Sequence, residues 1–131
     1  MRTSSNSAEF YSAFHKKALE ISAMSKAISE YLSADLSALS PNGNENPFIY
    51  FSGDIVQQAV SLSEEIAKAE RCSGLEKKQL HVQTLRWLTY RLIQNCKRLE
   101  LCNSNGRDFM PVLKRELKKF KSLQRRWAMM L

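Results

Sequence analysis

The sequence predicts an all-α protein, an antiparallel four-helix bundle built as a single domain from residues 1–131. Apolar residues recur at three- and four-residue intervals along most of the chain, and no stretch alternates as a strand would. The chain contains only 4 glycines and 3 prolines, so long uninterrupted elements are expected. The expected helices are joined by two tight turns and one longer loop between the first and second, which is typical of a bundle.

The first helix is predicted from about Ser7 to Leu39. Its apolar and small residues keep to one face, namely Phe14, Ala18, Ile21, Ser25, Ile28, Leu32 and Leu39. The longer loop follows at Ser40–Pro47, which is dense in turn-forming residues. The next residues, 48–51, are too apolar for free solvent and should pack against the bundle or a neighbouring subunit.

The second helix is predicted to begin near Ser52 or Asp54, either of which could cap it, and to end near Cys72. Its inward face is Ile55, Ala59, Leu62, Ile66 and Ala69. Gly74 suits the end of a helix, and Ser73 with Glu76 fits a capping box for the next one. So short a connection predicts an antiparallel hairpin of the second and third helices.

The third helix is expected to reach about Cys102 and the fourth to start with Asp108 and Pro111, after a break at residues 103–106. The inward face of the third is Val82, Leu85, Leu88, Leu92, Cys96 and Leu99. That of the fourth is Phe109, Leu113, Leu117, Phe120, Leu123, Trp127 and Met130.

Positive charge is concentrated on the opposite side of the fourth helix. The chain has a net charge of +7, and residues 107–131 hold eight basic and two acidic residues, which leaves +6 there. The cationic stripe consists of Lys114, Arg115, Lys118, Lys119, Lys121, Arg125 and Arg126. Such a stripe favours a polyanion, of which nucleic acid is the commonest. The alternative is an ordinary solvated helix face.

The third helix carries a second apolar side, formed by Leu80, Trp87 and Leu101 with Tyr90 beside them. Either another copy of the chain covers this side, which makes it an oligomer interface, or Trp87 covers residues 48–51 within the monomer. Further cations flank these aromatic residues, namely Arg86, Arg91, Lys97 and Arg98. This combination suits phosphate contacts with base stacking, or the docking of an acidic protein surface.

Nothing in the sequence favours catalysis, a cofactor or a metal. His15 and His81 lie on different helices, and Glu64, Glu65 and Glu70 diverge around the second helix, so these carboxylates are expected to be solvated. There is no glycine-rich phosphate loop and no ExxH motif. Three cysteines without CxxC spacing, no apolar run of about 20 residues and no signal peptide indicate a cytoplasmic protein rather than a membrane protein.

Two segments resemble a known family. The third helix contains LRWLTYRL at residues 85–92, and the last helix ends in LQRRW at residues 123–127. With the helix order and loop lengths of residues 55–131, these segments resemble the accessory variability proteins of diversity-generating retroelements. Those proteins are related to the four-helix-bundle proteins of 23S rRNA intervening sequences.

The resemblance implies a small basic bundle that assembles into a pentamer and lacks catalytic activity. It further implies a reverse transcriptase and RNA or DNA as partners, in support of mutagenic cDNA synthesis. The family's third helix typically carries two arginines four residues apart. Here Arg86 and Arg91 are five apart, so Arg91 with Arg98 is the preferred pair. The alternative functions are a protein-interaction module of the intervening-sequence type and, less favoured, a helix lying on a membrane surface.

Overall fold

A computed structural model of the chain describes the backbone of residues 2–37, 43 and 46–131, and within residues 2–12 only the side chain of Glu9. Its helices are α1 (Arg2–Leu36), α2 (Phe48–Arg71), α3 (Leu75–Leu99) and α4 (Met110–Met130), with a short 3-10 helix η1 (Asn105–Phe109) before the last. No strand occurs in these ranges. The predicted all-α fold with four helices is therefore confirmed.

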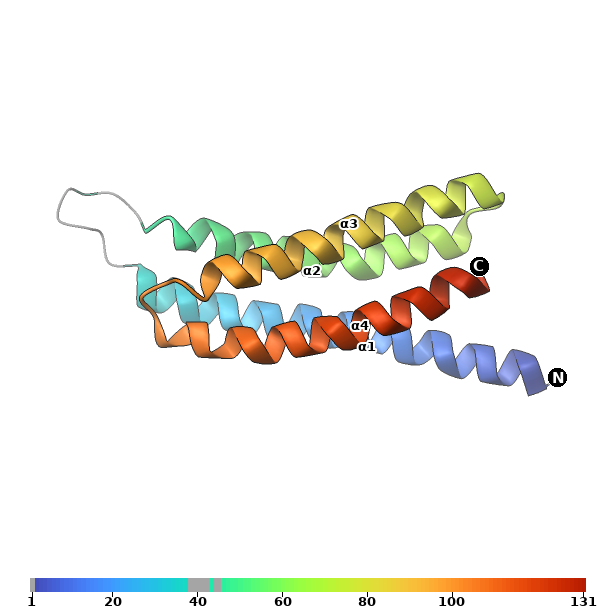
Figure 1. Cartoon of the computed structure of the whole chain (residues 1–131), viewed down its shortest axis with the longest axis horizontal. Coiled ribbons are helices and arrows are strands. Elements are labelled where there is room, and N and C mark those ends of the chain that lie inside the picture. Colours follow the sequence, from blue (N-terminus) through green and yellow to red (C-terminus); the bar gives the residue numbers. More distant parts are fainter. Residues whose placement is uncertain (1, 38–42, 44–45) are drawn as a thin grey trace.

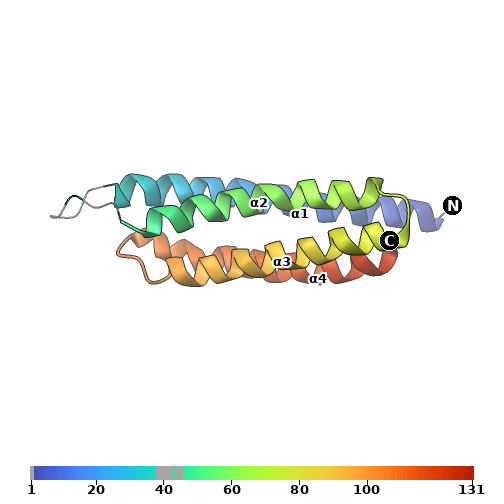
Figure 2. The same ribbon diagram turned by 90° about the horizontal axis from the view of Figure 1, so that it is seen from above.

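The helices form two adjacent antiparallel pairs, as Figure 1 shows. The tight turn at residues 72–74 makes α2 and α3 a hairpin, while α4 runs beside α1. Seen from above (Figure 2), the last turn of α1 and the first turn of α2 lie at one end of the bundle and the α2–α3 turn lies at the other. Each helix thus packs against its neighbour in sequence, and α4 packs against α1 to close the bundle.

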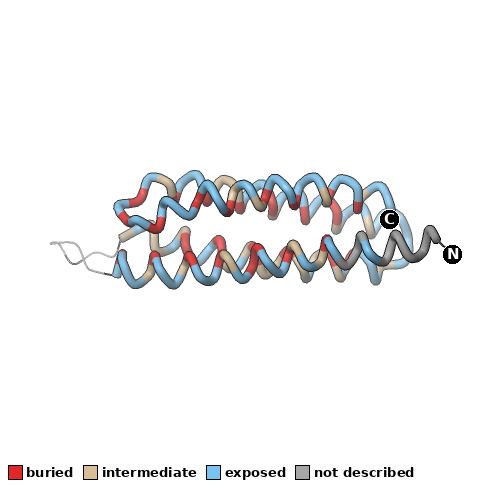
Figure 3. The backbone as a smooth tube through the Cα atoms, turned by 90° about the horizontal axis from the view of Figure 1, so that it is seen from below, coloured by how far each residue is buried: buried red, intermediate tan, exposed pale blue. Residues whose placement is uncertain are grey.

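Buried residues lie on the inward side of all four helices, coloured red along the backbone in Figure 3. The predicted inward faces of α1 and α2 are buried at every described position, and those of α3 are buried except for Leu88, which is half-buried. Aromatic rings join α1 to α4 in the core, where the ring of Phe14 stacks on Phe120 with centroids 4.9 Å apart and lies 5.4 Å from Trp127. Aromatic packing of this kind contributes beyond the area it buries.

The predicted start of α2 is wrong by about one turn. The helix begins at Phe48 with Pro47 as its N-cap residue, and the side-chain oxygen of Asn46, just before it, accepts the N–H of Phe48 at 3.0 Å. Ser52 is instead buried inside the helix and donates its hydroxyl to the carbonyl of Ile49 at 2.8 Å. The apolar residues 48, 49 and 51 pack against the core, as predicted.

The predicted capping box of α3 is also wrong. Gly74 is the N-cap with a φ of 97°, a backbone conformation that glycine tolerates best, and no side chain caps the helix. At the other end α3 stops at Leu99, three residues before the predicted Cys102. The side chain of Ser104 then accepts the N–H of Gly106 at 3.0 Å and starts η1, so α4 begins at Met110 rather than Asp108.

Two residues expected on the inward face of α4 lie outside it. Phe109 is 44% exposed and Met130 is 38% exposed, because the 3-10 turn and the free helix end depart from the pattern of the helix body. Leu123 is half-buried, and the other four predicted positions are buried. Leu39 and most of the predicted loop at residues 40–47 lie outside the described residues. In the described part of the chain, no helix has the length and apolar character to cross a membrane.

Candidate functional site: a basic groove between two helices

A groove of about 450 Å³ lies between α3 and α4 and is lined by basic side chains from both helices. Arg86 and Lys97 belong to the α3 wall, while Lys121 and Arg125 belong to the α4 wall. Its remaining lining residues are Thr89, Tyr90, Ile93, Gln94 and Gln124. None of the nine lining side chains is acidic, so the positive potential of the groove has no internal counter-charge.

The groove arises from matching spacings on the two helices. On α3, Arg86, Tyr90, Ile93 and Lys97 follow one another at intervals of four, three and four residues. On α4, the same intervals separate Lys114, Lys118, Lys121 and Arg125. Residues at these intervals share one edge of a helix. Each helix therefore presents a cation-bearing edge toward the other.

A buried polar contact forms the floor of the groove. The hydroxyl of Thr89 lies 3.0 Å from Oε1 of Gln124 and 2.8 Å from the carbonyl oxygen of Leu85, and both oxygens accept from it. Thr89 and Gln124 are buried. A hydrogen bond between two buried side chains fixes the position of one helix relative to the other, because breaking it would leave polar atoms unsatisfied.

A second hollow of about 340 Å³ continues the groove toward the end of α4. It shares Arg86 with the first hollow and adds Lys78, while Ala128 and Leu131 form its α4 side. Lys78 was not among the predicted binding residues. The two hollows together place five cations along one face of the α3–α4 pair, four in the first and Lys78 in the second.

The other predicted cations of α4 lie outside this groove. Lys114 bonds to Glu100 at the end of α3, and Lys119 forms an ion pair with Glu116 at 3.5 Å. At roughly 100° per residue, Arg115, Lys119 and Arg126 form a second row that faces outward, away from α3. Lys118 lies on the same helix edge as the groove residues and is exposed. The single stripe predicted from the sequence is thus two rows on the folded protein.

The preferred arginine pair of α3 lies on the outer side of the helix, and each member has its own aromatic partner. The guanidinium of Arg91 lies 5.5 Å from the ring centroid of Trp87. That of Arg98 lies 5.2 Å from the ring of Phe51 on α2 and donates to Asn95 at 3.1 Å. Cation–π contacts of this kind stabilise the monomer. Neither arginine lines the groove.

The second apolar side of α3 is open in the monomer. The exposed fractions are 62% for Leu80, 58% for Trp87, 60% for Tyr90 and 76% for Leu101. Trp87 therefore does not cover residues 48–51, so that alternative is wrong. Tyr90 lies where this side meets the groove and lines the groove as well.

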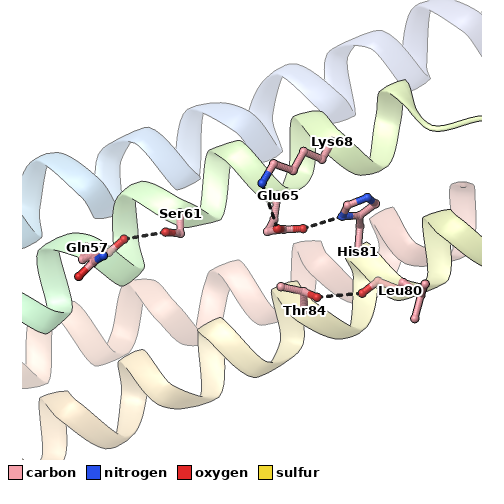
Figure 4. A network of polar contacts seen from close by, with 7 residues as sticks. All are labelled: Gln57, Ser61, Glu65, Lys68, Leu80, His81 and Thr84. Carbon is pink, nitrogen blue, oxygen red and sulfur yellow. Dashed lines mark hydrogen bonds and ion pairs between the residues drawn. The ribbon is translucent and has the colours of Figure 1, made fainter.

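The acidic residues of α2 do not all behave as solvated surface groups. Figure 4 shows Glu65 between His81 of α3, at 2.8 Å, and Lys68, at 3.6 Å. One oxygen of Glu70 accepts from His15 of α1 at 2.9 Å and from the indole N–H of Trp127 at 3.2 Å. The expectation that Glu65 and Glu70 are solvated was therefore wrong, because neighbouring helices supply hydrogen-bond partners for both carboxylates.

Metal-ligating side chains do not gather at one place among the described residues. No group of three His, Cys, Asp or Glu side chains within them could hold a metal ion. Burial raises the pKa of the Cys96 thiol to about 12, so this cysteine stays protonated at neutral pH. Lys17 donates to Glu116 at 3.1 Å and lowers the pKa of that carboxyl, which ties α1 to α4.

Comparisons with protein-family models, with curated proteins and with solved structures give no match to this chain. The groove between α3 and α4 and the exposed side of α3 are therefore the features that bear on function.

Proposed function

We propose that this chain is a non-enzymatic, basic nucleic-acid-binding accessory protein that holds the phosphate backbone of RNA or DNA in the groove between α3 and α4. The observation that supports this most strongly is the convergence of Arg86, Lys97, Lys121 and Arg125 from two helices on one groove without an acidic side chain. Phosphate contacts supply most of the affinity in sequence-independent nucleic-acid binding.

The shape of the site favours a linear polyanion over an acidic protein surface. The α3 cations extend from Lys78 to Lys97, a distance of about 28 Å along the helix axis. Opposite them, Lys121 and Arg125 belong to the regularly spaced edge of α4. A groove with cations along both walls suits a charged backbone that runs parallel to it. A protein partner would present a less regular pattern of carboxylates.

The test compares two variants with the same net charge. The groove variant carries Lys97→Gln, Lys121→Gln and Arg125→Gln. The control carries Lys16→Gln, Lys26→Gln and Lys77→Gln, which neutralises three exposed lysines of α1 and α3 outside the groove. Binding of a fluorescein-labelled oligonucleotide would be followed by anisotropy at low salt, and folding would be checked by circular dichroism.

The two variants should separate clearly. We expect the groove variant to lose at least about tenfold in affinity, since each lost phosphate contact reduces counterion release. The control should stay near the unmodified protein, because only its long-range charge has changed. Equal losses in both variants would show that binding is a general effect of net charge, and the groove would then not be the site.

The accessory role adds a reverse transcriptase and further copies of the chain as partners, supported by the resemblance and by the open apolar side of α3. Leu80, Trp87 and Leu101 are all more than half exposed in the monomer, which favours a protein contact there. Light scattering coupled to size exclusion should show a homo-oligomer, a pentamer by resemblance, that Leu80→Ser with Leu101→Ser dissociates. A monomer at all concentrations would remove this part of the proposal.

The polymerase partner needs its own measurement. A reverse transcriptase encoded beside this chain should co-purify with it and synthesise more cDNA in its presence. Failure of both would leave a nucleic-acid-binding protein without the accessory role. The runner-up function, a module that docks an acidic protein, would instead predict tight protein binding and weak affinity for every oligonucleotide.

A further inference from the structure

We infer that the nucleic acid held by this groove is single-stranded and that one of its bases stacks on Tyr90. This inference rests on the proposed function, because it concerns the same groove. It specifies the form of the ligand, which net charge alone does not determine. It also gives a role to an aromatic side chain that contributes nothing to the electrostatic attraction.

Tyr90 lies between two cations along the α3 wall of the groove. It lies one helical turn after Arg86 and seven residues before Lys97, and all three line the groove. Its side chain is 60% exposed although it carries a large apolar ring. A phosphate held by Arg86 would thus bring the attached nucleotide next to an accessible aromatic face. Base–aromatic stacking beside a basic track is how proteins bind single strands without sequence preference.

A duplex is too wide to enter this groove, and its bases have no free face for Tyr90 to stack on. Directly packed helices have axes about 8–10 Å apart, whereas the major groove of B-DNA alone is about 12 Å wide. A duplex could therefore touch only the rims of a groove between α3 and α4. Its bases are also stacked on one another, so no base face is available to Tyr90. A single strand is narrow enough to enter and has free base faces.

Tyr31 of α1 provides an aromatic control of the same residue type. It is 43% exposed but does not line the groove. Its ring meets that of Phe109 edge-on, with centroids 5.5 Å apart. A general preference of nucleic acid for exposed aromatic residues would involve both side chains, whereas binding in the groove involves Tyr90 alone.

The experiment measures anisotropy of labelled 20-nucleotide strands, as deoxythymidine and uridine homopolymers, and of a blunt DNA duplex of 20 base pairs. The proteins are the unmodified chain, Tyr90→Leu, Tyr90→Phe and Tyr31→Leu. Inorganic polyphosphate serves as a competitor that has charge but no bases. Circular dichroism confirms that each variant is folded.

We expect single strands to bind more tightly than the duplex. Tyr90→Leu should weaken single-strand binding by about 5- to 150-fold, while Tyr90→Phe and Tyr31→Leu stay near the unmodified protein. Polyphosphate competition and the salt dependence should be unchanged in Tyr90→Leu, because no phosphate contact is lost. Comparison of the deoxythymidine and uridine strands identifies DNA or RNA as the preferred source of the single strand.

Three outcomes would overturn the inference. Duplex affinity equal to or above that of the single strands would contradict the single-stranded ligand. An unchanged affinity in Tyr90→Leu, or an equal loss in Tyr31→Leu, would contradict stacking at Tyr90. In each case the proposed function stands as long as the variant with Lys97, Lys121 and Arg125 neutralised still loses binding. If that variant binds normally, the proposed function fails together with the inference.

Discussion

Neutralising two cations of the α4 wall should reduce the salt dependence of nucleic-acid binding by an amount that follows from the structure. Five cations line the two hollows, namely Arg86, Lys97, Lys121 and Arg125 in the first and Lys78 in the second. For single strands, the slope of log K against log salt is about −0.7 per neutralised phosphate. If each cation binds one phosphate, the slope of the unmodified protein is about −3.5.

This slope has a large effect over an accessible range of salt. Between about 50 and 200 mM, the affinity of the unmodified protein should fall by about 130-fold. Lys121→Gln with Arg125→Gln leaves three cations, so the slope becomes about −2.1 and the loss over the same range about 18-fold. A control with Lys16→Gln and Lys26→Gln should keep the steeper slope, because both lysines are exposed on α1 outside the groove.

The assay is anisotropy of a labelled single strand at five or more salt concentrations, at constant pH and temperature. The reasoning is refuted if the double variant keeps the slope of the unmodified protein, since its two cations would then contact no phosphate. A slope shallower than about −1 for the unmodified protein would equally refute it, because so small a value corresponds to one or two phosphate contacts rather than five.

Three further predictions concern the fold. Gly106→Ala should destabilise the protein by about 1–3 kcal/mol in urea unfolding, because a Cβ there would lie 2.5 Å from Leu32 Cδ2 in the core. Gly53→Ala, where no atom lies within 4 Å, should be neutral or stabilising, and equal effects at both sites would contradict the packing argument. Glu116→Gln should be less stable than the unmodified protein at pH 7. The difference in stability should shrink as the pH falls below 4.5 and should vanish once the pH has passed through the lowered pKa of Glu116. A difference that persists at pH 2 would show that the ionised Glu116 carboxylate is not its cause. At pH 8 a thiol reagent should label only the half-buried Cys72 in the folded protein, because Cys96 and Cys102 are buried. After denaturation it should label all three cysteines. Rapid labelling of Cys96 in the folded protein would contradict its burial.

The helices could be predicted because their periodicity is set by burial. Ile55, Ala59, Leu62, Ile66 and Ala69 are apolar at helical spacing, and all five are fully buried. Helix ends follow a weaker rule, because one or two residues determine them, such as Asn46 before α2 or Gly74 before α3. Asn46 is two residues before the first turn of α2, and the sequence offered two competing caps further along.

The groove could not be located from the sequence for a geometric reason. A helical wheel gives the angle of each residue around its own axis, but not which neighbour that angle faces. Arg86 and Lys97 oppose Lys121 and Arg125 only because α3 and α4 are adjacent, antiparallel and held in one register. The helical wheel therefore grouped Tyr90 with the outer residues of α3 and gave no reason to include Lys78 among the binding residues.

The internal contacts of Glu70 could not be predicted for the same reason. Its partners His15 and Trp127 come from α1 and α4, which are 55 and 57 residues away in the chain. Only the order of the helices around the bundle brings them to one carboxylate.

The hydrogen bond between Thr89 and Gln124 has a consequence for how this chain can vary during evolution. Sliding α4 past α3 by one turn would shift its cations by about 5.4 Å relative to those of α3 and would break this bond. An exchange of both residues for apolar ones of similar size could relax the register without altering any surface charge. Selection for ligand binding would then act on two buried, uncharged side chains as well as on the cations of the groove. Homologues that keep every lysine and arginine of the groove but lose this pair would be expected to bind poorly.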